Sequence, residues 1–185
     1  MRIALVHDWL NQSGGAEEVL AVLAQMFPQA PIYTSIYSPD SVSAEFRERD
    51  VRVSWADRLP SIHRQHQPYL IVFPFAFRGF DFSGYDLIIS NKSGFCHGIR
   101  KPAGATHICY CLTPTRYVWN LDGYLKRERF HSALPTLMRP FMRWLQRWDR
   151  GAADEVDYFV SISSAVQRRI TRFYGRDSDI IYPPV

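Results

Sequence analysis

Short apolar runs alternate with amphipathic helical patterns along the chain, and this alternation is the feature that most constrains the fold. The run "RIALVH" at residues 2–7 precedes a polar turn, after which apolar residues recur at helical spacing from Ala16 to Phe27. Further strand-like runs are "PIYTSIY", "VRVSW", "YDLIIS", "THICYCL", "VDYFVSIS" and "DIIYPPV". Strands that alternate with helices predict an α/β fold, in which helices cover both faces of a mainly parallel sheet.

The length and composition suit one folded domain. With 185 residues, of which 46% are hydrophobic, the chain can build a single core, or it is one half of a larger protein. A net charge of +4 allows an anionic partner without choosing among nucleotide, lipid surface and nucleic acid. His7 and Asp8 interrupt the first apolar run too early for a signal peptide, and the three cysteines are an odd number. We therefore expect a cytoplasmic protein with reduced thiols.

A glycine pair, Gly14 and Gly15, follows the first predicted strand. In a parallel α/β sheet, ligands bind beyond the carboxyl ends of the strands, and glycine lets the backbone approach them closely. The amides at the start of the following helix also favour a phosphate. Alternatively the pair is a plain turn, and Glu17 and Glu18 only complement the helix dipole. Because these carboxylates repel an anion, a bound phosphate needs positive charge from elsewhere.

A second set of polar residues follows the run "YDLIIS", at the same predicted edge of the sheet. Here Lys92 can supply a cation and His97 a proton-transfer group, with Ser93 beside them. Alternatively all three are solvated loop residues. Cys109 and Cys111 are two apart in a strand and share one face, where apolar packing is favoured over a metal site because no second ligand pair accompanies them.

The loop "TPTRYVWN" combines hydroxyl groups, a guanidinium and two aromatic rings, which is the mixture that sugar and phosphate sites use. Thr113 and Arg116 are the candidate contacts of this loop. The alternative is that Tyr117 and Trp119 anchor the loop in the core.

The predicted helix over residues 134–150 carries an arginine stripe opposite its apolar side, with tryptophans near the boundary. Such a helix can lie on an anionic membrane surface, although the solvated face of an ordinary surface helix is the favoured interpretation in a domain with a core to build. We expect Pro140 to bend it. The membrane-surface candidates are Arg139, Arg143, Trp144 and Arg147.

Four stretches, "GGAEEVL", "YCLTPTRYVWN", "RWDRGAADEVDYFVSIS" and "IIYPPV", resemble in order and spacing the amino-terminal domain of a family 4 glycosyltransferase of the mannosyltransferase-like branch. The resemblance implies the N-terminal half of a GT-B fold, in which two Rossmann-like domains face each other across a cleft without a required metal or bound cofactor. In this family the first domain chiefly binds the acceptor, and the anomeric configuration is retained.

The resemblance also assigns residues. It implies that Gly14 and Gly15 approach the donor diphosphate and the acceptor, and that Arg116 contacts phosphate or acceptor. Family members commonly carry a histidine where this chain has Leu112, so no catalytic residue is assigned. The candidate cleft-lining residues are Asp8, Lys92, Ser93, His97, Thr113, Arg116, Trp119 and Ser163.

The expected function is that of the acceptor-binding domain, at residues 1–181, of a retaining transferase that moves a hexose such as mannose. Residues 182–185 begin the interdomain linker in this reading, and the donor-binding domain is absent, so the chain alone should not transfer sugar. The expected partners are a nucleotide sugar as co-substrate, a lipid-linked or polysaccharide acceptor and the inner membrane face, with no nucleic acid. The alternatives are a non-catalytic sugar- or protein-binding domain and a sugar-nucleotide epimerase.

Overall fold

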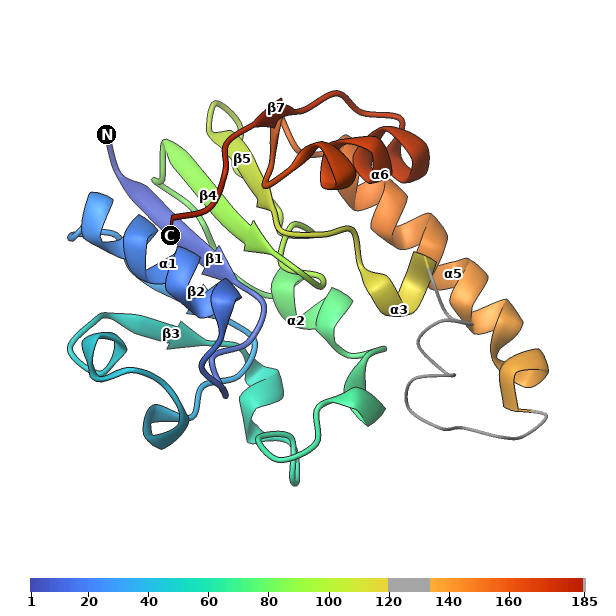
Figure 1. Ribbon diagram of the computed structural model, residues 1–185. Helices are drawn as coiled ribbons and strands as arrows, with labels where there is room; N and C mark the ends of the chain where they lie inside the picture. The colour runs from blue at the N-terminus through green and yellow to red at the C-terminus, as the bar shows by residue number, and fades with distance from the viewer. Residues whose placement is uncertain (120–133, 185) are drawn as a thin grey trace.

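The computed structural model describes residues 1–119 and 134–184, and its side chains from Pro140 onward in the second range. Its strands form one seven-stranded sheet in the order β3-β2-β1-β4-β5-β6-β7, and every neighbouring pair is parallel (Figure 1). The predicted parallel α/β sheet is confirmed. The strands are β1 (Ile3–His7), β2 (Ile32–Thr34), β3 (Val51–Val53), β4 (Leu87–Lys92), β5 (Thr106–Cys111), β6 (Tyr158–Ser161) and β7 (Asp179–Ile180).

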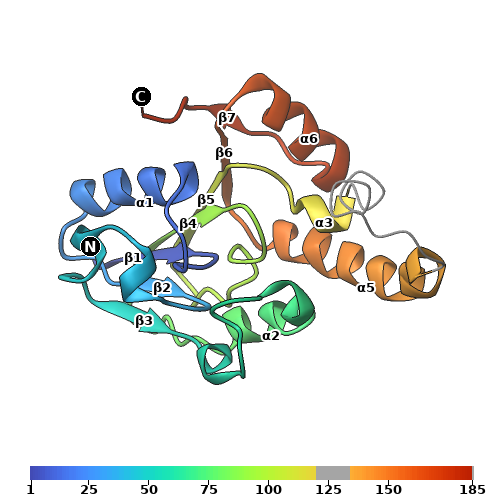
Figure 2. The same cartoon turned by 60° about the horizontal axis from the view of Figure 1, so that its bottom comes forward.

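Helices cover both faces of the sheet (Figures 1 and 2). Because successive strand residues point to opposite faces, Leu5 packs in the cluster of Leu20 from α1, whereas Val6 packs in the cluster of Phe77 from α2 and Leu145 from α5. The predicted three layers are therefore present. The described helices are α1 (Gly15–Met26), α2 (Phe73–Arg78), α3 (Arg116–Trp119), α5 (Leu134–Asp154) and α6 (Ser164–Tyr174), with 3₁₀ turns η1 (Pro39–Ser41), η2 (Ala44–Phe46), η3 (Trp55–Arg58) and η4 (Gln67–Tyr69).

The predicted helix over residues 134–150 begins at Leu134 as α5, and the segment "SAVQRRITRFYG", whose serines suit an N-cap and which stops at a glycine, forms α6. Ser163 caps α6 by accepting a hydrogen bond from the amide of Val166, and Gly175 ends the helix with a φ of +68°. Helix α5 contains Pro140 and continues past the predicted end to Asp154. The extension follows from two buried alanines, 152 and 153, which prolong the apolar stripe. The bend at Pro140 stays a prediction.

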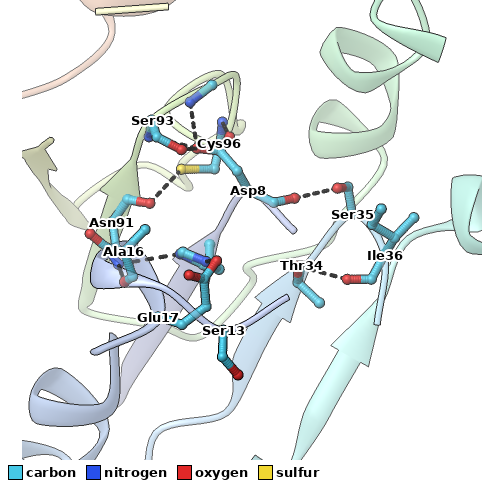
Figure 3. A network of polar contacts seen from close by, with 12 residues as sticks. Asp8, Ser13, Ala16, Glu17, Thr34, Ser35, Ile36, Asn91, Ser93 and Cys96 are labelled. Atoms are coloured by element: carbon cyan, nitrogen blue, oxygen red, sulfur yellow. Dashed lines mark hydrogen bonds and ion pairs between the residues drawn. The ribbon is translucent and has the colours of Figure 1, made fainter. Parts of the chain in front are cut away.

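The carboxyl ends of β1 and β4 are joined by one buried side chain. The carboxylate of Asp8 accepts hydrogen bonds from the amides of Ser93 and Gly94 with Oδ2 and from those of Phe95 and Cys96 with Oδ1, at 2.5–2.8 Å (Figure 3). A Cβ at position 94 would lie 2.9 Å from Asp8 Oδ1, so only glycine lets the loop approach this closely. Asp8 therefore fixes the loop after β4 against β1.

We predict that Asp8→Ala lowers the free energy of unfolding by at least about 3 kcal/mol, because buried amides are left without an acceptor. Urea unfolding followed by tryptophan fluorescence measures the change. The matched control is Asp81→Ala, since Asp81 is an exposed aspartate whose hydrogen-bond donors, among the described residues, come from Ser83 two positions on, and its effect should be much smaller. Equal unfolding midpoints for the two variants would contradict the role of Asp8.

Candidate functional site

A cavity of about 620 Å³ opens at the carboxyl edge of the sheet, above β1, β4, β5 and β6. The strand order reverses between β1 and β4, and this is the position where open α/β sheets bind ligands. Each segment of the wall follows the end of one strand. The wall consists of Trp9, Gln12, Gly15, Ala16, Glu17, Glu18, Val19, Ser93, Leu112, Arg116, Tyr117, Ile162, Pro183 and Pro184.

A second hollow, of about 420 Å³, lies at the amino edge of the sheet. Its charged groups are already engaged within the protein, because Arg52 pairs with Asp50 at 2.8 Å and Arg2 lies 5.1 Å from the ring centre of Tyr85. The carboxyl-edge cavity is therefore the stronger candidate.

The glycine turn forms one wall of the cavity. Gly14 precedes α1 without a side-chain cap, and its carbonyl accepts the amides of Glu17 and Glu18 at 3.0 Å. The first amides of α1, at Gly15 and Ala16, have no acceptor within the helix. A Cβ at position 15 would meet nothing within 4 Å. Neither glycine has a positive φ, so backbone strain does not require them, and open space above Gly15 is what the missing side chain provides.

A buried polar network supports this turn from below. The Nδ2 of Asn91 donates to the carbonyl oxygen of Ala16 at 2.7 Å and lies 3.3 Å from His7 Nδ1 (Figure 3). Because the Ala16 oxygen can only accept, the side-chain amide of Asn91 presents its nitrogen there and also to His7. His7 Nδ1 therefore accepts a hydrogen bond, and the proton of this ring lies on Nε2, 3.4 Å from Glu17 Oε1. Glu17 is 4% exposed, and its other oxygen has no hydrogen-bond partner among the described residues.

The opposite wall comes from the loop after β5 and from α3. Arg116, the first residue of α3, is exposed and lines the cavity with Tyr117, and Leu112 lies beside them. Ser93 joins the wall from the loop after β4. The structure thus brings Gly15, Ser93 and Arg116 together at the predicted edge. The charged groups that the wall exposes are the guanidinium of Arg116 and the carboxylate of Glu18, since the carboxylate of Glu17 is buried against His7.

Three predicted cleft residues have side chains inside the protein instead. Asp8 is the buried anchor described above. Lys92 is fully buried and donates from Nζ to Thr115 Oγ1 at 3.1 Å. The predicted strand ends at Ser90, but β4 continues to Lys92, and strand alternation turns this side chain into the protein. Burial alone would lower the pKa of Lys92, but Asp149, Cys111, Cys109 and Asp8 raise it above its ordinary value.

His97 is fully buried, with Nε2 at 3.2 Å from the carbonyl oxygen of Asp149. Burial and the nearby Lys92 ammonium lower the pKa of His97 to about 4, so its ring is neutral at pH 7. Without access to the cavity, this histidine has no route to a substrate proton. Its position differs from the predicted one because the loop after β4 folds inward, around the carboxylate of Asp8.

The remaining predicted residues have structural contacts. Thr113 is buried and donates to the carbonyl oxygen of Pro114, and Ser163 caps α6. Trp119 stacks on Phe173 at 4.8 Å and donates from its indole nitrogen to Asp149 at 2.6 Å. For Trp119 the structure shows the alternative reading, a core anchor.

Sequence reasoning missed Asp149, although a signal was present. Asp149 lies four residues after Leu145 and seven after Met142, on the apolar stripe of α5. A carboxylate in that position has to be buried among hydrogen-bond donors.

The predicted membrane face of α5 is partly described. Arg143 and Arg147 are exposed, and Trp144 is 37% exposed. Trp144 stacks on Phe75 of α2, which is 54% exposed, with ring centres 5.9 Å apart. The side chain of Arg139 lies outside the described residues. The exposed surface therefore includes α2, which the sequence did not indicate.

Within residues 1–119 and 134–184, no group of three or more side chains is placed to hold a metal ion. Over the same ranges, no helix has the length and apolar character needed to span a bilayer.

The sequence profile of Glycosyltransferase Family 4 matches residues 13–185. Among solved structures, the crystal structure of Anabaena Alr3699/HepE in complex with UDP is similar, with a TM-score of 0.54 and 18% identity over 100% of this chain and 44% of that chain. This chain thus spans less than half the length of that structure. The likeness confirms the predicted Rossmann-like half of a GT-B fold. No curated protein matches the chain. Because the profile covers nearly all of the sequence, the chain belongs to glycosyltransferase family 4.

Proposed function

We propose that this chain forms the acceptor-side half of a retaining glycosyltransferase, which moves a hexose, with mannose as the first candidate, from a nucleotide sugar to a lipid-linked or polysaccharide acceptor. Family membership supports glycosyl transfer in general. The observation that carries the finer proposal is the cavity at the carboxyl edge, which is lined both by Gly15, with open space above it, and by Arg116.

The charges of the cavity favour a hydroxyl-rich ligand over a diphosphate alone. The exposed carboxylate of Glu18 lines it together with the guanidinium of Arg116, and the buried carboxylate of Glu17 adds negative charge beneath the wall. Carboxylates accept hydrogen bonds from sugar hydroxyl groups but repel phosphate oxygens. The amides of the glycine turn can contact one phosphate, and most of the diphosphate charge then needs neutralisation by a second domain.

Along the chain, that second domain would begin directly after residues that line the cavity. Pro183 and Pro184 line the cavity just after β7, so a linker starting at residue 182 would leave from the rim of the site. The partial coverage of the Anabaena structure supports a further domain, and the UDP in that structure supports a nucleotide-sugar donor. On this proposal the chain alone orients an acceptor without turning over the donor.

One observation favours a non-catalytic, sugar-binding role instead. Leu112 lies in the cavity wall, at the position where the family resemblance leads one to expect a histidine. An apolar side chain there can pack against a sugar ring but cannot donate a hydrogen bond to it. Transfer by the full-length protein would exclude this alternative.

The first test is a transfer assay with the full-length protein and a panel of radiolabelled nucleotide hexoses, namely UDP-glucose, UDP-galactose and GDP-mannose, with extracted membrane lipids and polysaccharide as acceptors. We expect label to move to an acceptor. Arg116→Ala should lower kcat/KM by about 10- to 100-fold, because a charged hydrogen bond to the ligand is lost. Arg169→Ala, an exposed arginine on α6, is the matched control and should change little. Sugar binding without transfer of any label would favour the non-catalytic role.

A second prediction concerns the space above the glycine turn. Gly15→Ala should leave stability unchanged or raise it by up to about 1 kcal/mol, since alanine favours a helix. The added methyl group should nevertheless lower kcat/KM by about tenfold or more by blocking close approach of the ligand. Gly151→Ala is the matched control, because a Cβ there also meets nothing within 4 Å, but on α5 and away from the cavity. Normal activity of Gly15→Ala would refute a backbone contact with the ligand.

The proposed site of action is the membrane surface, reached through the aromatic face of α2 and α5. Phe75 and Trp144 form an exposed stack beside the exposed guanidinium groups of Arg143 and Arg147. Aromatic rings suit the headgroup layer, and arginines suit anionic lipids. A lipid-linked acceptor would then be presented to the same molecule that binds the bilayer.

We predict that Trp144→Ala weakens binding to phosphatidylglycerol vesicles by about tenfold, because apolar area is no longer buried in the lipid. Vesicle co-sedimentation measures the partition coefficient, and high salt should weaken binding of the unmodified protein further. The matched control is Met26→Ala, since Met26 is 62% exposed at the end of α1, on the other face of the sheet. Equal loss in both variants would show that this face has no special role.

A further inference from the structure

We infer that Asp149 is a positioning residue that holds Arg116 in the cavity wall by fixing helix α3, an inference that rests on the proposed function of that cavity. Asp149 lies on α5 and is fully buried, so it does not touch a ligand in the cavity. It acts through the residues that it binds.

Helix α3 cannot hold its own shape. Its described part, Arg116–Trp119, is one helical turn, and a single turn is unstable without tertiary contacts. Two residues of α5, one turn apart, supply those contacts. Asp149 Oδ2 accepts the indole N–H of Trp119 at 2.6 Å, and Gln146 Nε2 donates to the carbonyl oxygen of Val118 at 2.9 Å.

The start of α3 is fixed by the other carboxylate oxygen. Thr115 Oγ1 lies 2.8 Å from Asp149 Oδ1 and 2.7 Å from the carbonyl oxygen of Gly94, and it accepts a hydrogen bond from Lys92 Nζ at 3.1 Å. A buried cation and a buried carboxylate are thus bridged by one hydroxyl group. Thr115 directly precedes Arg116 in the chain, so this bridge fixes the backbone position from which the Arg116 side chain extends to the cavity.

The carboxylate also ties in α6, since Tyr174 donates to Oδ2 at 2.7 Å. Burial and the Asp149 carboxylate raise the pKa of Tyr174 well above its ordinary value, which keeps this phenol a donor. Asp149 therefore collects donors from two segments that lie far apart in the sequence, the stretch from Thr115 to Trp119 and helix α6.

The hydrogen-bond geometry gives a conservative variant. In Asp149→Asn, an amide nitrogen in the place of Oδ1 can donate to Thr115 Oγ1, whose own proton then goes to the Gly94 carbonyl. The amide oxygen in the place of Oδ2 still accepts from Trp119 and Tyr174. Asparagine therefore keeps the position of α3, whereas alanine loses it.

The test compares Asp149→Asn, Asp149→Ala and Arg116→Ala in the full-length protein, with the donor and acceptor that give the highest rate in the transfer assay. We expect Asp149→Asn to keep kcat/KM within about threefold and Asp149→Ala to lose about as much as Arg116→Ala, about 10- to 100-fold. The double variant Arg116→Ala/Asp149→Ala should lose no more than either single variant. Additive losses, or an equal loss in Asp149→Asn, would overturn the inference.

Hydrogen exchange separates this inference from the proposed function. In Asp149→Ala, amide exchange over residues 113–119 should speed up at least about tenfold, and in Arg116→Ala it should not. If no sugar is transferred but exchange changes as expected, the proposed function fails and the control of α3 by Asp149 holds. If Asp149→Ala does not fold, Trp119→Phe removes one donor with little change in volume and should speed exchange in the same segment. Unchanged exchange in the folded variant would overturn the inference.

Discussion

The carboxylate of Asp8 is the interaction on which the cavity depends. It lies at the end of β1, where the strand order reverses, and it binds the backbone of the loop that leaves β4. Without this contact the two strand ends would carry independent loops, and the wall between Gly15 and Ser93 would not be fixed. Because the acceptor is a buried charge, its hydrogen bonds to the amides are stronger than neutral ones. A ligand therefore meets a site that is already formed.

A buried carboxylate fixes a loop at two places along this edge of the sheet. Asp8 fixes the loop after β4, and Asp149 fixes the loop after β5 through Thr115 and Trp119. In both places a short connection that lacks regular hydrogen bonds receives them from a buried carboxylate. Buried charges are costly unless they are hydrogen-bonded, and both carboxylates accept several hydrogen bonds. The loops at the rim of the cavity are thus held in place by the two buried carboxylates beneath them.

The sequence predicts the frame of this structure better than its polar interior. Alternating apolar runs are enough to place the strands, and the caps at Ser163 and Gly175 are local signals. The directions of Lys92 and His97 depend on where β4 ends and on how its loop folds around Asp8, which are long-range contacts. Residue type and spacing in the sequence place such residues near the correct edge of the sheet. They do not distinguish a buried charged side chain from one that contacts a ligand.

The groups exposed in the cavity wall differ from those buried beneath it, and this difference has a chemical consequence. The histidines beneath the wall, His7 and His97, are buried, whereas the exposed wall offers backbone amides, Leu112, the guanidinium of Arg116 and the carboxylate of Glu18. Such a surface can bind and orient a sugar, but it holds few groups that respond to charge developing on a leaving diphosphate. On the proposed function, stabilisation of that charge comes from a second domain across the cavity. The buried carboxylates are thus best understood as supports for a binding surface, whose chemistry is completed by whatever faces it.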